Sequence, residues 1–348
     1  MNLEGLDQTA GTDSAGVYMQ VLFSTVPEAL QAFDTGSGEI YASLLAGSLD
    51  EGMTRAGRLV ARSNQSFVEG WGLWVNANGR TASTDGDGNA ADVSADGFGF
   101  DTGIDYRGPD NGWALGATFG YLKGNLNVEA RRSTANYDGW HVGGYGRFGT
   151  GGAGFTGTAA LNYTNSDANV RRTIEVNNIT RTAQGFAGVN VFAISGELRY
   201  GLGAAKGSRA GWALGPIVSV QHAKADLGQV REAGANSLDI SSAGGSDSMT
   251  RYGGGVFGNW QGAQGGFDIS AQYVGGSANI AQIGVSLAGA PGITSAVRSA
   301  RTSGSAGLFT IAGEYSLGSG WSIGGNVRAL LGKDEKSAQG NVTVGWAF

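Results

Sequence analysis

The chain has 348 residues, a formal net charge of −6 at neutral pH, 64 glycines, 4 prolines and no cysteine. The acidic balance argues against nucleic acid as a partner, and the lack of cysteine excludes disulfides and thiol chemistry. No run of roughly 18 apolar residues occurs, so no membrane-spanning helix is expected. Polar and acidic residues follow Met1 without an apolar stretch, so no signal peptide is expected; if the protein is exported, this sequence should be part of a longer precursor.

A helical pattern runs from Val26 to Arg62. The sequence Thr25-Val26-Pro27-Glu28 predicts the start of a first helical piece, and a second piece is expected from Ser37 to Arg62. This second piece is ~39 Å long, but its charges prevent it from facing lipid, so it must lie on a soluble core or inside something hollow. Its apolar stripe consists of Leu45, Leu49, Met53, Ala56 and Val60. The charged residues of the opposite face are Asp50, Glu51, Arg55, Arg58 and Arg62.

From Phe67 to the end of the chain, apolar and polar residues alternate with a period of two. The first such segment places Trp71, Leu73 and Val75 on one face, and twelve segments of this kind can be counted, each about the ~9–11 residues that a tilted membrane strand needs. The second face carries glycine, hydroxyl and ionisable residues. This period fits either a soluble β-sandwich or a membrane barrel whose apolar face meets lipid.

Three further features favour the barrel. The strand number is even, and aromatic residues such as Trp71 and Tyr106 lie at strand ends, where a membrane interface places them. Connections alternate between long ones (78–94, 124–134, 165–188, 224–246 and 276–302) and short ones (107–111, 149–152, 203–211, 261–265 and 318–320). The sequence therefore predicts an all-β membrane protein, a 12-stranded antiparallel transmembrane β-barrel, and the helix is expected in its lumen.

Two sequence features flank the predicted barrel. The segment Ser37-Gly38-Glu39-Ile40-Tyr41-Ala42-Ser43 precedes the first strand, and the last strand ends in Val342-Thr343-Val344-Gly345-Trp346-Ala347-Phe348. Together with the twelve alternating strands, they make residues 25–348 resemble the C-terminal translocator domain of bacterial autotransporters, the type V secretion proteins.

The resemblance implies a location and a function. The barrel would be anchored in the bacterial outer membrane, the helix would thread its lumen, and an N-terminal passenger would be exported to the cell surface. Residues 1–24 would then be a passenger remnant or linker, 25–66 the helical plug segment and 67–348 the barrel. Some members cut the helix at an asparagine inside the lumen, but no Asn occurs between Thr25 and Ser63, which argues against that cleavage here.

The resemblance also implies partners. These are outer-membrane lipid, the passenger itself and the β-barrel assembly machinery, and the protein is expected to be a monomer. The pattern that resembles the signal read by the assembly machinery is Val342, Val344, Trp346 and Phe348.

None of the enzyme or cofactor motifs in the sequence lies in the structural context that its function requires. Residues 144–149 match the dinucleotide pattern GxGxxG but lie in a strand and not before a helix. Residues 85–89 resemble a calcium loop, but Ala90 replaces the glycine such a loop requires. His141 and His222 have no recognisable nucleophile. We therefore expect no enzyme activity, no cofactor and no metal.

Charged residues on the polar strand faces form the candidate site. Isolated charges in a narrow lumen are costly, so both signs should pair with each other, with water or with the helix. Small helix residues such as Gly52 and Gly57 suit a helix inside a twelve-stranded bore. We also expect the apolar stripe to pack against lumen residues such as Trp74. The inward charged residues are Asp101, Asp105, Arg147, Glu197, Arg199, Arg251, Asp268, Glu314 and Arg328.

Other interpretations remain open at this point. The inward charges are compatible with an ordinary hydrated pore lining, and the main alternative is an outer-membrane diffusion porin whose N-terminal helix is periplasmic. A hydrolase with its site at the barrel rim and a soluble β-sandwich are weaker alternatives.

Overall fold

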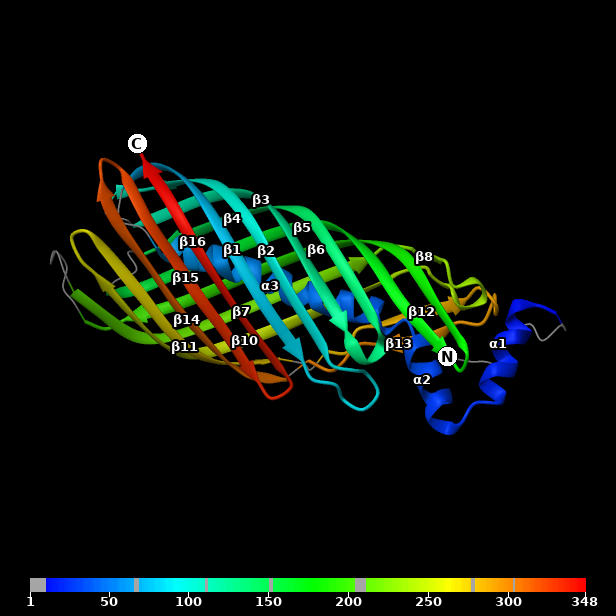
Figure 1. Cartoon of the computed structure of the whole chain (residues 1–348). Helices are drawn as coiled ribbons and strands as arrows, with labels where there is room; N and C mark the ends of the chain where they lie inside the picture. The colour runs from blue at the N-terminus through cyan, green and yellow to red at the C-terminus, as the bar shows by residue number, and fades with distance from the viewer. Residues whose placement is uncertain are drawn as a thin grey trace.

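The protein is a closed antiparallel β-barrel with three N-terminal helices (Figure 1). The computed structural model describes residues 11–65, 69–109, 112–149, 153–203, 211–276, 279–302 and 304–348. The first and last strands pair, with Leu73 opposite Trp346, and β7 pairs with both β6 and β10, which closes the sheet. The twelve strands of the wall are β1 (Gly70–Thr84), β2 (Val93–Arg107), β3 (Trp113–Val128), β4 (Ser133–Phe148), β5 (Gly154–Val176), β6 (Ile179–Gly201), β7 (Gly211–Leu227), β10 (Gly245–Gln261), β11 (Gly265–Gly276), β14 (Ser305–Gly318), β15 (Trp321–Gly332) and β16 (Glu335–Ala347).

The helices are α1 (Asp13–Leu22), α2 (Val26–Gly36) and α3 (Glu39–Asn64). Thr25 and Glu28 form the predicted capping box at the start of α2, with the Thr25 amide donating to Glu28 Oε2 over 2.8 Å. Gly38 adopts φ +73° and separates α2 from α3, so the second helical piece begins at Glu39 and not at Ser37. Helix α3 runs along the barrel interior, whereas α1 and α2 lie beyond one end (Figure 1). None of the described helices is long and apolar enough to cross a membrane.

Helix α1 was not predicted. It lies within residues 1–24, which were expected to be a passenger remnant or linker, and residues 1–10 of that segment lie outside the described ones. Thr12 caps α1, because its Oγ1 accepts a hydrogen bond from the Ala15 amide over 3.2 Å. Val17 and Val21 of α1 are buried in the main apolar core. The expected barrel start at Phe67 also lies outside the described residues, and β1 begins at Gly70.

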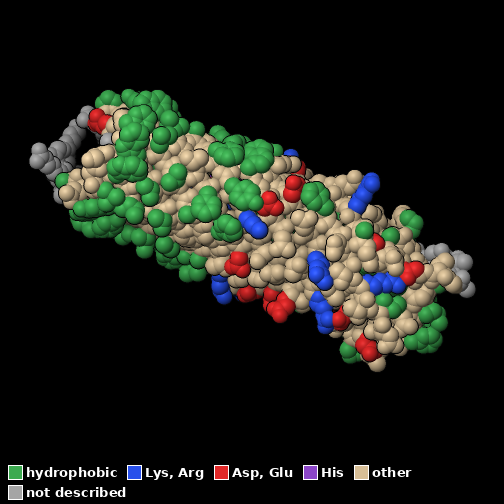
Figure 2. Space-filling model, turned by 45° about the horizontal axis from the view of Figure 1, so that its top comes forward, with side chains coloured by type: hydrophobic (Ala, Val, Ile, Leu, Met, Phe, Trp, Pro, Cys, Tyr) green, Lys and Arg blue, Asp and Glu red, His purple; other side chains and the backbone are tan. Residues whose placement is uncertain are grey.

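On the face drawn in Figure 2, exposed apolar side chains gather toward one end of the barrel. Figure 2 shows hydrophobic side chains gathered over one half of this face and charged side chains over the other half. The apolar half includes the rim where Gly70 and Phe348 lie, which we call the terminal rim; the opposite end is the distal end. Aromatic rings pack along the terminal rim, with Trp71 5.1 Å from Tyr106 and Tyr106 5.3 Å from Trp113 between ring centroids. This apolar band is the part of the wall suited to lipid.

The long connections expected at the distal end are largely strand. Residues 165–188 belong to β5 and β6, which a two-residue turn joins after Val176. The connection 224–246 contains β8 (Val230–Ala233) and β9 (Ile240–Ser242), and 276–302 contains β12 (Gln282–Leu287) and β13 (Ser295–Arg298). The prediction of open loops was therefore wrong at these positions, and the strands continue well beyond the apolar band.

The alternation changes sign where the strands leave the apolar band. On β5, Leu161 and Tyr163 point outward within the band, but farther along the strand Asp167 is exposed while Val170 and Ile174 are buried. The distal ends of the strands, together with β8, β9, β12, β13, α1 and α2, thus surround an apolar core like that of a soluble protein; we call this part the distal cap. Its core includes Ile40, Leu45, Leu49, Leu126, Val170, Ile174, Val189, Leu238, Ile240 and Ile283.

Candidate functional site

The candidate site is the contact surface between α3 and the barrel wall. One of its polar contacts involves Asp50, which is paired with Arg80 of β1 and with Arg251 of β10. Arg251 Nη1 lies 2.7 Å from Asp50 Oδ1, and Arg251 Nη2 lies 2.5 Å from Glu335 Oε1. Arg80 also lies 3.1 Å from Glu51 Oε2. Five side chains from three strands and α3 thereby share their charges, which lowers the cost of burying them.

About two turns farther along α3, a second contact joins Arg58 to the wall. Arg58 Nη2 lies 3.4 Å from Asp101 Oδ2, and the other oxygen of Asp101 lies 2.7 Å from His141 Nε2. His141 Nδ1 lies 3.2 Å from Asn162 Nδ2. His141 is thus a polar wall residue that is buried between Asp101 and Asn162.

The third contact lies near the terminal rim, where Arg62 meets two acidic residues. Arg62 Nη2 lies 3.1 Å from Asp105 Oδ2, and Arg62 Nη1 lies 3.7 Å from Glu314 Oε2. The Arg62 guanidinium also lies 5.3 Å from the centre of the Trp74 ring, a cation–π distance. Asn64, the last residue of α3, donates from Nδ2 to Glu197 Oε1 over 3.1 Å.

The remaining predicted charges occupy the wall in other ways. Arg199 pairs with Asp268 and with Glu197, each at 2.5 Å, and so belongs to a network within the wall. Arg328 donates to Gln221 Oε1 over 3.2 Å, and its guanidinium lies against Gly57 of α3. Arg55, predicted to face the wall, makes its ion pair with Glu51 of its own helix at 2.7 Å. Arg147 is buried on β4.

Apolar residues of α3 pack on both sides of these charges. Leu59 and Val60 form a cluster with Trp74, Tyr145 and Ala160 near the terminal rim. Leu45, Leu49 and Met53 instead lie in the core of the distal cap. The apolar stripe of the helix therefore faces apolar partners in both halves of the barrel.

The helix fits closely against the wall. A Cβ atom on Gly57 would lie 1.7 Å from Arg328 Nη1, and one on Gly52 would lie 2.6 Å from Val191 Cγ1. Three cavities along α3 have volumes of about 40, 20 and 30 Å³, enough for one to three water molecules each. The alternative of a porin whose helix lies outside the barrel is thus wrong for this fold, because α3 occupies the lumen.

Four partners in the site were missed from the sequence: Arg80, Arg107, His141 and Glu335. Arg80 lies within 78–94, which the sequence predicts as a connection because the outward residues next to it are polar, and Glu335 precedes the apolar alternation of the last strand. Arg107 lies 3.3 Å from Asp105 and sits at the last position of β2, where a turn was expected. For His141, the sequence does not show its pairing with Asp101. Trp74, Asn76 and Arg80 are spaced by even numbers of residues, as on one face of a strand. This spacing is the signal that extends β1 to Thr84 and places Arg80 on its inward face.

The residues of the other motifs make ordinary structural contacts. In residues 85–89, Asp87 Oδ1 accepts hydrogen bonds from the Asn89 and Ala90 amides at 3.0 Å, so this carboxylate closes a turn. Residues 144–149 run along the end of β4. His222 Nδ1 lies 2.8 Å from Thr250 Oγ1. Across the part of the chain that the structure describes, no group of three or more His, Asp or Glu residues is placed to hold a metal ion.

Solved structures with the same architecture are autotransporter domains. The fold is similar to the translocator domain of autotransporter NalP from Neisseria meningitidis, with 13% sequence identity over 88% of this chain and 99% of that chain and a TM-score of 0.69. It is also similar to the transport unit of the autotransporter AIDA-I from Escherichia coli (15% identity, 86% and 99% coverage, TM-score 0.54). A third similar structure is the β domain of the Bordetella autotransporter BrkA, with 15% sequence identity over 80% of this chain and 100% of that chain and a TM-score of 0.51. At these identities the likeness concerns the fold.

The family is decided by sequence. The model of the autotransporter β-domain family matches residues 73–328, most of the chain. The chain belongs to the autotransporter family. The sequence matched none of the curated proteins with which it was compared. As an autotransporter translocator, it is an outer-membrane protein of type V secretion whose barrel anchors in the membrane and serves the export and surface display of an N-terminal passenger.

Proposed function

We propose that α3 is the plug of this translocator: it remains in the lumen after export and seals the barrel. The observation that carries the proposal is the set of buried ion pairs of Asp50, Arg58 and Arg62 with four different strands, combined with cavities of water size. The helix charges reach these wall partners only when the helix is seated, so leaving the lumen would strand Asp50, Arg58 and Arg62 and would take from Arg80 its partners on α3. Residues 11–64 form the helical segment in this proposal, and the barrel begins at Gly70.

The proposal also assigns an orientation. The passenger precedes the helices, and α1 and α2 lie beyond the distal end, so this end faces the cell exterior and the terminal rim faces the periplasm. The short turns and both barrel termini then lie on the periplasmic side, as in other outer-membrane barrels.

The protein acts without catalysis and as a monomer in this proposal. Its buried histidine is held between Asp101 and Asn162, which supports a structural role. The side chains of Val342, Val344 and Trp346 on β16, and of Phe348 directly after it, are exposed, and the Trp346 and Phe348 rings stack at 5.0 Å between centroids. This accessible aromatic edge supports recognition of the last strand by the β-barrel assembly machinery.

Conductance in planar lipid bilayers tests the plug. The intact chain should show low conductance with rare openings, whereas a chain without residues 1–64 should form a wide, steadily open pore, because nothing replaces the helix in the lumen. Heat-modifiable migration in gels would show that the shortened barrel is folded. Equal conductance of the two folded proteins would disprove the plug.

A further inference from the structure

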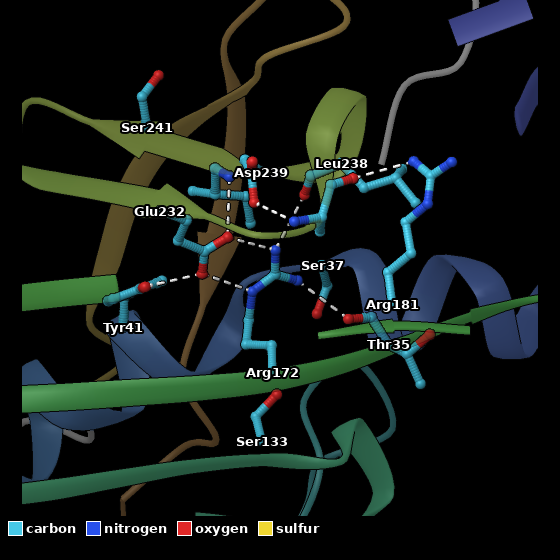
Figure 3. Close-up of polar contacts among 12 residues, drawn as sticks. Thr35, Ser37, Tyr41, Ser133, Arg172, Arg181, Glu232, Leu238, Asp239 and Ser241 are labelled. Atoms are coloured by element: carbon cyan, nitrogen blue, oxygen red, sulfur yellow. Dashed lines mark hydrogen bonds and ion pairs between the residues drawn. The ribbon is translucent and has the colours of Figure 1, made fainter. Parts of the chain in front are cut away.

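A second group of buried charges lies in the distal cap, outside the lumen site. Arg172 at the outer end of β5 pairs with Glu232 of β8, and both side chains have 0% exposure. The pair is bidentate, with Arg172 Nε donating to Glu232 Oε1 over 2.7 Å and Nη2 donating to Oε2 over 2.6 Å. Figure 3 shows the two side chains meeting between the strands and the helices. Such a pair is stable away from water only when its remaining hydrogen-bonding capacity is met.

Four further contacts complete the pair, and they come from two sources (Figure 3). From the helical segment, the Tyr41 hydroxyl donates to Glu232 Oε1 over 2.7 Å, and the Thr35 carbonyl accepts from Arg172 Nη1 over 3.0 Å. From the connection between β7 and β10, the Ile240 amide donates to Glu232 Oε2 and the Leu238 carbonyl accepts from Arg172 Nη2. We call these six residues the latch cluster: Thr35, Tyr41, Arg172, Glu232, Leu238 and Ile240.

The backbone of the helical segment fits the same place. Gly38 turns the chain between α2 and α3 with φ +73°, and a Cβ atom there would lie 2.5 Å from Ile240 Cδ1. Ile40 and Leu238 are fully buried beside it. Part of the cap wall therefore closes directly over the junction of α2 and α3, and it fits a bent glycine-containing chain at that point.

Because Arg172 and Glu232 are buried, the cap can close only over a chain segment that supplies their hydrogen-bond partners. Burial and the neighbouring Glu232 carboxylate raise the pKa of the Tyr41 phenol, so it stays protonated and donates. If another stretch of chain occupied the cap, Arg172 would lose the Thr35 carbonyl and Glu232 would lose the Tyr41 hydroxyl. Both ions would then need water, and the connection carrying Glu232 would have to move aside to admit it.

We propose that the latch cluster closes the distal cap over the junction of α2 and α3 when this segment arrives there, and so holds the plug from the outer side. The inference rests on the proposed function in taking the distal end as the exit. Chain that passes earlier lacks the Thr35 and Tyr41 partners, so the cap remains open while it passes. The lumen ion pairs hold α3 from within, and the latch cluster prevents its outward movement.

The test uses the full-length protein folded in lipid nanodiscs, with limited trypsin digestion. Arg231 lies beside Glu232; its side chain is exposed, but its backbone is paired in β8, so cleavage after it reports opening of the cap. Arg172→Met removes the charge from the wall side, and Gly38→Val wedges the junction from the helix side. Both should speed cleavage after Arg231 by at least ~10-fold, because Arg172→Met leaves Glu232 buried without its cation and Gly38→Val sets a side chain against Ile240 at a φ that favours glycine.

A matched control and a second readout separate a latch from a local packing defect. Arg132→Met breaks the exposed ion pair with Glu175 in the same cap and should change the cleavage rate less than ~3-fold. In bilayers, both latch variants should open more often than the intact chain, while the control should not.

Two results would overturn the latch. One is unchanged cleavage after Arg231 in both variants while heat-modifiable migration shows a folded barrel. The other is faster cleavage without more frequent openings, because the cap would then open without freeing the plug. Neither result affects the plug proposal, which depends on removal of residues 1–64.

Discussion

Asp50 shows how single charges are accommodated inside this barrel. Its carboxylate meets Arg80 and Arg251, and Arg251 is shared with Glu335 on another strand. Charges of both signs from helix and wall thus replace water around one another, and the cost of removing one exceeds that of an exposed pair. The packing also restricts the residue at position 57, because the Arg328 guanidinium occupies the space that the Cβ atom of any residue larger than glycine would need.

Replacing Arg251 tests this network. Arg251→Met leaves Glu335 without its cation and Asp50 with Arg80 alone, so we expect the barrel to lose about 3–5 kcal/mol of unfolding free energy. Urea unfolding followed by tryptophan fluorescence in detergent measures the change. Lys224→Met is the control, because its pair with Asp226 is more than half exposed on both sides and should be worth less than about 1 kcal/mol. A similar loss in the two variants would contradict the network.

At the scale of elements, polar contacts hold α1 to the rest of the distal cap. Arg181 Nη2 lies 2.5 Å from Asp13 Oδ1, and the Ser237 amide donates to Asp13 Oδ2 over 3.0 Å. The hydrogen bond from Arg181 lowers the pKa of the Asp13 carboxyl well below its usual range. Ionised Asp13 is therefore the form that holds α1 in place.

This contact predicts loss of α1 docking in acid. Because the folded-state pKa of Asp13 is depressed, its contribution is complete above the ordinary value near 4 and falls as pH drops through the folded value. Hydrogen exchange of α1 amides, corrected for intrinsic rates, should show less protection at pH 3 than at pH 6. Asp13→Asn should show weak protection at both values, and a variant that keeps the full pH dependence would exclude Asp13 as its source.

At the scale of the whole molecule, the barrel combines two solvent environments along its axis. Near the terminal rim the wall is apolar outside and charged inside, as in a membrane barrel. In the distal cap the wall is polar outside and apolar inside, and it packs on the first turns of α3 as a soluble domain would. The strands thus anchor the barrel in the membrane and also build the folded cap above it.

Two positions on the outward face of β5 test this division. The chain has no cysteine, so single cysteines can be introduced at Asp167 in the cap and at Leu161 in the apolar band. A membrane-impermeant maleimide on intact cells should label Asp167→Cys and leave Leu161→Cys unmodified, because lipid covers the band. Labelling of Asp167→Cys only after rupture of the outer membrane would reverse the proposed orientation.

The sequence by itself determined the barrel class, the strand number and the helix inside it. These follow from local periodicity: Leu73, Phe100 and Leu115 alternate with small or polar residues because lipid lies on one side of the wall and the lumen on the other. The charged face of α3 was equally visible, since Asp50, Arg58 and Arg62 recur at helical spacing.

Only the tertiary structure decided which charges pair and where the strands end. Pairing of Asp50 with Arg251 joins residues 201 positions apart, and no local pattern encodes such a distance. The sequence does not reveal the distal parts of the strands, because the apolar and polar faces exchange sides where the strands leave the lipid. Polar residues such as Asp167 then occupy the outward face, which is apolar within the membrane. The latch cluster is likewise assembled from α2, α3, β5, β8, β9 and the turn between β8 and β9, and each of its residues alone resembles an ordinary helix, loop or strand position.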